Sequence, residues 1–256
     1  YGGNTSCILV KAGGHNIILD SGTGIISVGK ELIQNNPNNP IKTTILISHC
    51  HLDHILGFQY FQPAFIPSTK INIFGSKNLD VELIDIIKNL LNEHFSPVLL
   101  EERPAEINIS NIDSLQTILL FEDGHIEIAN NSKSWIESDD NIVKILCFKS
   151  FSHPRNGINF YKITWKNKSV VYASDTEEHD NNSLSLAEFA KDADILMHDA
   201  QYIESDYNSS CFPKHGFGHS TPKMATQTAI KASVKKLILF HYDPNYSDQL
   251  INIHNV

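Results

Sequence analysis

Short apolar runs that end in histidine or aspartate recur along this chain, and they constrain its fold more than any other feature. Such runs end at Asp20, His49, Asp175, Asp199 and His241. Apolar runs of about four to eight residues between turn signals are typical of buried strands. In α/β proteins, the polar residues that hold ligands gather where strands end. We therefore expect an α/β protein whose functional site is built from these strand ends.

The segments between these ends predict a succession of strands and helices. In the first half of the chain we expect strands on either side of Gly13-Gly14, a helix at 25–34, strands at 43–48 and 70–76, and a helix at 79–93. A β-rich stretch at 105–128 follows. We then expect three strands between 141 and 176, with a tight turn around Asn167, and helix–strand pairs that end near His198 and His241. The polar segment 130–141 predicts a surface loop. This pattern favours two sheets with helices outside, and one domain over residues 1–256 is the simplest organisation.

The charge of the chain argues against a long nucleic acid as its partner. The formal net charge is −9, and Arg103 and Arg155 are the two arginines that could make bidentate contacts with phosphate. A protein that holds a polyanion normally presents a strong positive surface. We therefore expect a small substrate.

Cysteine usage and hydropathy indicate a reduced, non-membrane compartment. Cys7, Cys50, Cys147 and Cys211 lack CxxC spacing and are predicted to be free thiols. No apolar run approaches the ~20 residues of a membrane span, and no charged-then-apolar leader is visible. We expect a cytoplasmic protein.

The densest chemical signal is the segment His49-Cys50-His51-Leu52-Asp53-His54, which follows a predicted buried strand. In an extended run His49 and His51 point to the same side, and a following turn can bring Asp53 and His54 to a second point nearby. Imidazole and carboxylate are ligands that zinc and neighbouring first-row metals accept. The segment therefore predicts a site for two metal ions, which hydrolytic enzymes hold ~3.5–4 Å apart.

The motif His49-x-His51-x-Asp53-His54 resembles the signature of the metallo-β-lactamase superfamily. The other motifs of that superfamily are present in order: Asp20 in ILDSGTG, His153 in SHPRNGINFYKI, Asp175 in YASDT and His241 in LILFHYDP. The resemblance covers essentially the whole chain. It implies a four-layer αββα sandwich, in which two mixed β-sheets pack face to face with helices outside, and it identifies the chain as a metal-dependent hydrolase.

The resemblance also implies which residues bind metal. It assigns one ion to His49, His51 and His153, the other to Asp53, His54 and His241, and makes Asp175 the bridge between them. Two divalent ions are expected, with zinc favoured and manganese or iron as alternatives. Metal-bound hydroxide would then attack the substrate, with Asp53 and Asp175 as catalytic ligands.

The C-terminal motifs resemble those of the phosphodiesterase and ribonuclease Z branch. In that branch the histidine of the GFGHST turn faces the scissile phosphate, which implies that His219 stabilises the transition state or protonates the leaving group. Asp20 is expected to orient a ligating imidazole or backbone near the metals. His198 and Asp199 are expected to support His219 or the metal site, and a strand-end capping role explains these two residues equally well. Arg155, Asn156 and Lys214 flank the motifs and are candidate substrate contacts, although solvated loop positions are the favoured explanation for them.

These observations favour a phosphodiesterase for a small, including cyclic, phosphodiester. Ribonuclease Z proteins carry a basic, Gly-rich arm that grips transfer RNA, and the sequence has no such insertion. The alternatives are a ribonuclease Z-like endonuclease that processes tRNA 3′ ends and, in another class, a non-catalytic sensor of a metal or nucleotide. The amphipathic segment 79–104 could form a lid or a homodimer surface, although packing on the core is slightly favoured.

Overall fold

The structure of this chain is a computed structural model that describes residues 3–130, 140–177 and 185–254. It contains two compact units, an N-terminal unit, Asn4–Asp113, and a C-terminal unit, Ser114–Val256. Most of the loop predicted at 130–141 lies outside the described residues. None of the helices in the described ranges combines the length and apolarity needed to cross a bilayer.

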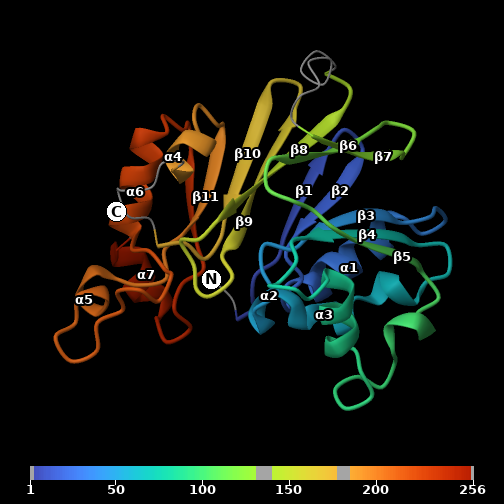
Figure 1. Cartoon of the computed structure of the whole chain (residues 1–256), viewed down its shortest axis with the longest axis horizontal. Helices are drawn as coiled ribbons and strands as arrows, with labels where there is room; N and C mark the ends of the chain where they lie inside the picture. The colour runs from blue at the N-terminus through green and yellow to red at the C-terminus, as the bar shows by residue number, and fades with distance from the viewer. Residues whose placement is uncertain (1–2, 131–139, 178–184, 255–256) are drawn as a thin grey trace. The chain divides into compact units, whose positions relative to one another are not determined.

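The N-terminal unit is built on one mixed sheet (Figure 1). Its strands, in spatial order, are β1 (Ile8–Ala12), β2 (His15–Leu19), β3 (Lys42–Leu46), β4 (Lys70–Gly75) and β5 (Glu106–Asn111). The first two strands are antiparallel and joined by Gly13-Gly14, both at positive φ, so the predicted hairpin is confirmed. Strands β2 to β5 are parallel, and their carboxyl ends therefore share one edge of the sheet.

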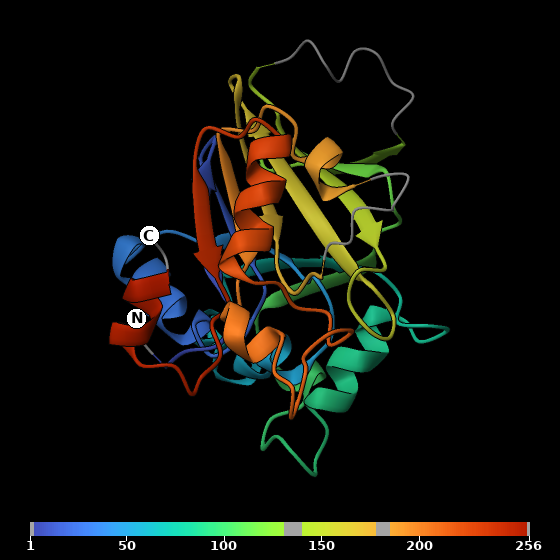
Figure 2. The ribbon, with the colours of Figure 1, turned by 90° about the vertical axis from the view of Figure 1, so that its left-hand side faces the viewer.

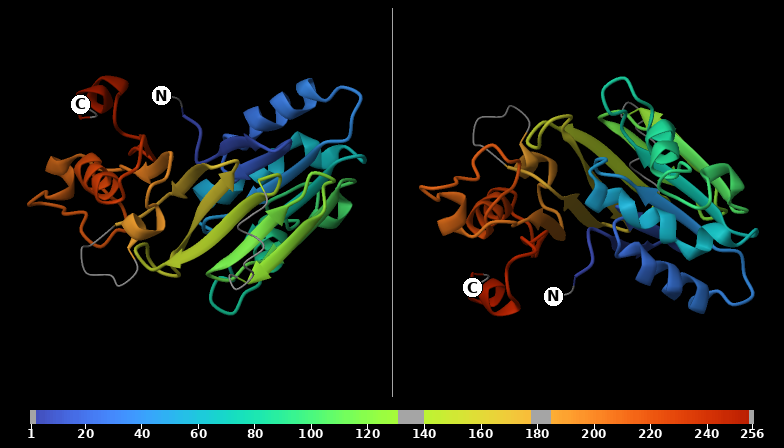
Figure 3. Two further views of the ribbon diagram at one scale, coloured as in Figure 1. Left: turned by 90° about the horizontal axis from the view of Figure 1, so that it is seen from above. Right: turned by 90° about the horizontal axis from the view of Figure 1, so that it is seen from below.

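Helices cover this sheet because their apolar stripes match its buried face. The elements are α1 (Ile25–Asn35), α2 (Leu52–Ile55), the 3₁₀ turns η1 (Leu56–Tyr60) and η2 (Gln62–Phe65), α3 (Leu83–Leu90) and η3 (Leu100–Glu102). Helix α1 packs against η1 and η2 (Figure 3). A Cβ atom at Gly29 would lie only 3.0 Å from Pro63, so glycine permits this close approach. Each fully buried Ile or Leu of this core contributes about 1.5–3 kcal/mol.

The helix predicted at 79–93 is shorter than expected. Asn78 and Val81 exchange backbone hydrogen bonds in a tight turn, and Leu79 has a φ of +53°, so the helix begins only at Leu83. The apolar side of α3 lies in the hydrophobic core of the N-terminal unit. This agrees with the interpretation that the 79–104 segment packs on the core. Likewise the strand predicted at 43–48 ends at Leu46, because the backbone N–H of Ser48 donates to a carboxylate instead of the sheet.

The C-terminal unit is built on a second mixed sheet. Its strands, in spatial order, are β12 (Leu237–Phe240), β11 (Ile195–Asp199), β10 (Lys168–Ala173), β9 (Ile158–Trp165), β8 (Val143–Ser150), β6 (Gln116–Leu120) and β7 (Ile126–Asn130). Lys166 and Asn167 have positive φ in the two-residue turn between β9 and β10, which confirms the predicted turn. Strands β10, β11 and β12 are parallel, so their carboxyl ends also lie together.

The helices of the C-terminal unit are α4 (Leu186–Phe189), α5 (Glu204–Tyr207), α6 (Pro222–Lys231) and α7 (Asp248–His254). Helix α6 lies along β11 and β12, and it also contacts α4 (Figure 2). Thr221 caps α6 by accepting a hydrogen bond from Met224 N, and Pro222 occupies the first turn. The hydroxyl of the preceding residue, Ser220, donates instead to the Thr176 carbonyl. This bond ties the start of α6 to the loop after β10.

Candidate metal centre

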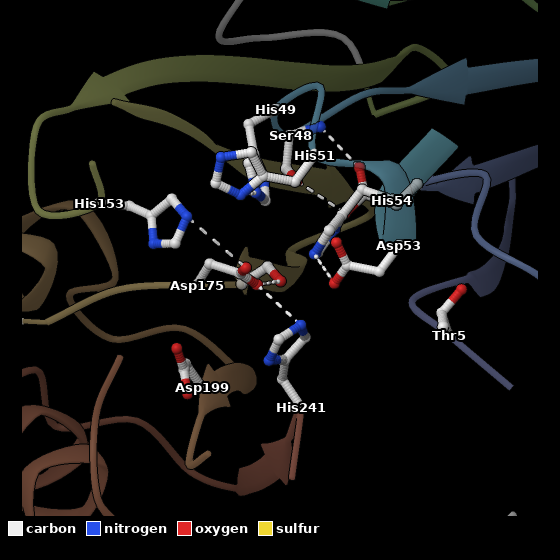
Figure 4. Close-up of polar contacts among 12 residues, drawn as sticks. Thr5, Ser48, His49, His51, Asp53, His54, His153, Asp175, Asp199 and His241 are labelled. Atoms are coloured by element: carbon white, nitrogen blue, oxygen red, sulfur yellow. Dashed lines mark hydrogen bonds and ion pairs between the residues drawn. The ribbon is translucent and has the colours of Figure 1, made fainter. Parts of the chain in front are cut away.

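The N-terminal ligand set, His49, His51, Asp53 and His54, lies where β3 leads into α2. His51 is extended and precedes the first residue of α2, and His54 N donates to His51 O across the turn. The extended stretch brings His49 Nε2 and His51 Nδ1 within 2.9 Å. The turn brings His54 Nε2 within 3.1 Å of Asp53 Oδ2 (Figure 4). One short segment thus presents two pairs of ligand atoms.

Asp20 controls the orientation of this set from the end of β2. Its buried carboxylate accepts hydrogen bonds from the backbone N–H and hydroxyl of Ser48 and from His54 Nδ1, each at 2.7 Å. Because a carboxylate only accepts, Nδ1 of His54 carries its proton and the lone pair lies on Nε2. Asp20 has a φ of +60°, a conformation that non-glycine residues adopt mainly where the surroundings enforce it.

The C-terminal ligand set, His153, Asp175 and His241, lies on loops after β8, β10 and β12. Asp175 is 2% exposed. Its Oδ2 lies 3.8 Å from His153 Nε2 and its Oδ1 lies 3.4 Å from His241 Nε2 (Figure 4). The two oxygens of one carboxylate therefore face two different imidazoles.

The spacing and chemistry of these donors fit divalent cations. Two donors bound to one tetrahedral zinc ion at 2.0–2.1 Å lie about 3.4 Å apart. The pairs His49 with His51, Asp53 with His54, and Asp175 with His241 lie at 2.9, 3.1 and 3.4 Å. Neutral imidazoles and carboxylates are ligands that zinc, manganese and iron accept.

His153 and His219 are both oriented by hydrogen bonds at Nδ1. The imidazole of His153 donates to the Gly218 carbonyl at 2.8 Å, which leaves its lone pair on Nε2. His219 donates to Asp199 Oδ2 at 2.7 Å, and its ring stacks on that of His241 with centroids 5.2 Å apart. Asp199, Asp175, His219 and His241 each bring a ligand-type atom within 4.8 Å of the others.

Asp199 is itself held by the backbone. Its Oδ2 also accepts from Thr176 N at 3.0 Å and its Oδ1 accepts from Gln201 N at 2.8 Å. His198 points elsewhere, with Nδ1 bonded to the Asp199 carbonyl at 2.7 Å. Burial lowers the pKa of His198, which keeps its imidazole neutral.

The candidate substrate contacts lie on loops of the C-terminal unit. Arg155 is exposed, Asn156 is half-buried, and the Lys214 ammonium lies 3.8 Å from the centre of the Phe212 ring. The structure corrects the expectation for Arg103, which is 5% exposed and donates to the carbonyls of Phe58 and Gln59. Arg103 therefore holds the turn after the histidine motif, and Arg155 is the remaining arginine able to reach a ligand.

Two residues of this region were missed in the sequence. Ser48 binds Asp20, and its hydroxyl also lies 3.1 Å from His49 Nδ1. Glu177 is 3% exposed and accepts hydrogen bonds from Gly216 N and Gly218 N, both at 2.8 Å. In the sequence, Ser48 directly precedes the histidine cluster and Glu177 lies two residues after Asp175. These positions were the signals that could have identified them.

The chain belongs to the β-lactamase superfamily, because residues 15–242 match the family described as "Beta-lactamase superfamily domain". It is a metal-dependent hydrolase of that superfamily and binds divalent metal, with the predicted α/β fold. The four cysteines are free thiols, as expected.

Particular relatives sharpen this placement. Ribonuclease Z of Picrophilus torridus is 28% identical over 231 residues, which cover 80% of this chain and 70% of the relative. The crystal structure of the metallo-β-lactamase fold protein YhfI from Bacillus subtilis has a TM-score of 0.63 at 18% identity and covers 98% of this chain and 83% of that one. The crystal structure of a diphosphatase from the PhnP family has a TM-score of 0.62 at 16% identity, and the match covers 97% of this chain and 78% of that one. The two structures share the fold.

Proposed function

We propose that the two ligand sets together hold two divalent ions and that the protein hydrolyses a phosphodiester. By the family resemblance, His49, His51 and His153 would hold one ion and Asp53, His54 and His241 would hold the other, with Asp175 shared by both. The observation that carries the proposal is Asp175, whose two oxygens face two different imidazoles. Zinc suits a set this rich in imidazole, and manganese or iron would also accept it.

The chain's own residues hold the ligands and manage a proton. When bound, such ions lower the pKa of a water molecule toward about 7 and neutralise charge that develops on a phosphoryl group. Asp20 and the Gly218 carbonyl fix His54 and His153 with Nε2 available for a cation. Asp199 fixes Nδ1 of His219, so Nε2 is the atom that delivers a proton to the leaving oxygen. The carboxylate of Asp199 also stabilises the protonated ring.

We propose a small phosphodiester, cyclic ones included, as the substrate. The net charge of −9 disfavours capture of a polyanion. The burial of Arg103 removes one of the two arginines from any phosphate contact. Arg155, Asn156 and Lys214 are the proposed contacts because they lie on loops next to His153 and His219 in the sequence.

A ribonuclease Z-like endonuclease that processes tRNA 3′ ends is the second candidate. The similarity to ribonuclease Z of Picrophilus torridus extends over most of both chains and favours it. The chemistry at the ions would be the same, and the two candidates differ in how the rest of the substrate is held.

The decisive experiment measures hydrolysis of bis(p-nitrophenyl) phosphate, with and without chelator, together with elemental analysis. We expect chelator-sensitive turnover and about two metal equivalents per chain. Cleavage of a 2′,3′-cyclic nucleotide in preference to a precursor tRNA supports the small substrate, and the reverse preference supports the endonuclease. Two bound metals without turnover of any phosphodiester would instead indicate a sensor and contradict the proposal.

A further inference from the structure

Glu177 is a buried carboxylate whose hydrogen bonds converge on one loop. Its Oε1 accepts from Gly216 N at 2.8 Å and from the Tyr207 hydroxyl at 2.6 Å, and its Oε2 accepts from Gly218 N at 2.8 Å. Its own backbone N–H donates to the Ser152 carbonyl at 3.0 Å. Glu177 therefore connects the loop after β10 to the loop that contains Gly216 and Gly218.

That loop determines the position of two residues of the proposed centre. The Gly218 carbonyl accepts the proton of His153 Nδ1, and the next residue is His219. Gly216 and Gly218 have φ values of +80° and +83°, so the loop follows a path that most residues resist and needs partners to hold it. A carboxylate that accepts two backbone N–H groups is a strong partner, because charged hydrogen bonds are roughly twice as strong as neutral ones.

We propose that Glu177 is a positioning residue that fixes the Gly216–Gly218 turn and thereby sets both the tautomer of His153 and the placement of His219. This inference rests on the proposed function for the roles of those two histidines. Both oxygens of Glu177 are engaged, one with each glycine N–H, so the turn cannot rotate or move away without breaking a hydrogen bond to a buried carboxylate. Ser220, bonded to the Thr176 carbonyl, holds the other side of the turn.

The competing explanation is that Glu177 only anchors Tyr207 and helix α5. Tyr207 is 7% exposed, and burial followed by the bond to Glu177 raises the pKa of its phenol, which remains a donor at neutral pH. Replacing Tyr207 with Phe removes this contact and leaves both glycine contacts intact. Tyr207→Phe is therefore the matched control for variants of Glu177.

The test compares Glu177→Gln and Glu177→Asp with Tyr207→Phe. Gln keeps the size but presents an N–H₂ group to one of the two glycine donors, whereas Asp keeps the charge but falls short of the turn. The first readout is the tautomer of His153, measured by ¹⁵N–¹H correlation of histidine-labelled, metal-free protein. The second readout is the affinity for Co²⁺, followed by its visible absorption. The third is kcat and KM for bis(p-nitrophenyl) phosphate.

We expect both Glu177 variants to lose the fixed Nδ1–H tautomer of His153 and to bind Co²⁺ about 10–100-fold more weakly. We also expect kcat to fall much more than KM changes, while Tyr207→Phe stays close to wild type in all three. Circular dichroism shows whether each Glu177 variant is folded. If Glu177→Gln does not fold, Glu177→Asp is the variant that tests the proposal. Wild-type tautomer and Co²⁺ affinity in a folded Glu177 variant would overturn the proposal, as would equal losses in Tyr207→Phe. The tautomer and Co²⁺ readouts stand even where wild-type protein fails to turn over phosphodiesters, so the two proposals fail separately.

Discussion

The carboxylate of Asp20 and the imidazole of His54, separated by 34 residues in sequence, are joined by a 2.7 Å hydrogen bond in which both side chains are fully buried. This contact exists because β2 and β3 are parallel neighbours, so the residues that follow their ends meet at one edge of the sheet. It fixes which nitrogen of His54 offers a lone pair. The same principle recurs at His153, where a backbone carbonyl replaces the carboxylate.

Replacing Asp20 with Asn should weaken metal binding without removing a ligand. The amide oxygen can accept only part of the three hydrogen bonds that the carboxylate takes, so the tautomer of His54 is no longer fixed. We expect metal affinity to fall about 10–100-fold, measured by competition with a chromophoric chelator. Asp85→Asn, on the exposed side of α3 in the same unit, is the control. Unchanged affinity in Asp20→Asn would show that His54 is oriented by other contacts.

Replacing Asp175 with Asn should lower the metal content itself. The two oxygens of Asp175 face His153 and His241, and a neutral amide cannot serve two cations as a carboxylate does. We expect elemental analysis to fall from about two equivalents to about one or fewer. Asp192→Asn is a suitable control, because Asp192 is exposed and its φ of +56° is one that Asn tolerates. Two equivalents retained in Asp175→Asn would contradict a bridging role.

Replacing His219 with Ala should separate turnover from metal binding. His219 is bound to Asp199 and is assigned a proton-transfer role, so its loss should reduce kcat by roughly 10²–10⁴-fold. Metal content measured on the same preparation should stay at the wild-type value. Normal turnover would exclude His219 as the proton donor, whereas loss of metal would show that it is a ligand.

Alanine at Gly218 should be far more damaging than alanine at Gly216. Both glycines have φ near +80°, so either substitution carries a backbone cost of about 1–2 kcal/mol. A Cβ at Gly218 would also collide with Pro154 Cδ and His153 Nδ1, whereas a Cβ at Gly216 meets nothing within 4 Å. We expect Gly218→Ala to lose a further ~1–3 kcal/mol of unfolding free energy, measured in urea, and to lose activity. Equal stabilities in the two variants would show that the loop shifts freely.

Asp194 should make the C-terminal unit sensitive to acid. Its carboxylate accepts from Lys235 Nζ at 2.8 Å, from Ser169 N at 2.9 Å and from Lys168 Nζ at 3.2 Å, which together hold its pKa well below the ordinary value. A lowered folded-state pKa gives a stabilisation that is complete above the unfolded value of about 3.9 and is lost as the pH falls below it. The difference in unfolding free energy between wild type and Asp194→Asn should therefore be constant from about pH 5 to 7 and shrink below about pH 4. A difference independent of pH would exclude the charge as its cause.

Much of the fold was predictable because its signals are local. The Gly13-Gly14 hairpin and the turn at Asn167 each depend on residues within a few positions. The apolar strands were also correctly located. The helix predicted at 79–93 was too long, because its periodicity continues through Leu79 although the backbone has already turned there.

By itself, the sequence determined which metal-ligand side chains are available and in what order they occur. It also determined the contacts within the segment from His49 to His54, because a strand followed by one helical turn dictates them. Only the tertiary structure decided that Asp20 orients His54, that Arg103 is buried, and that Glu177 holds a turn 39 to 41 residues away. Such contacts depend on which strands are neighbours and on how the loops after them pack. That information arises from burial and sheet order over the whole unit, and no local pattern contains it.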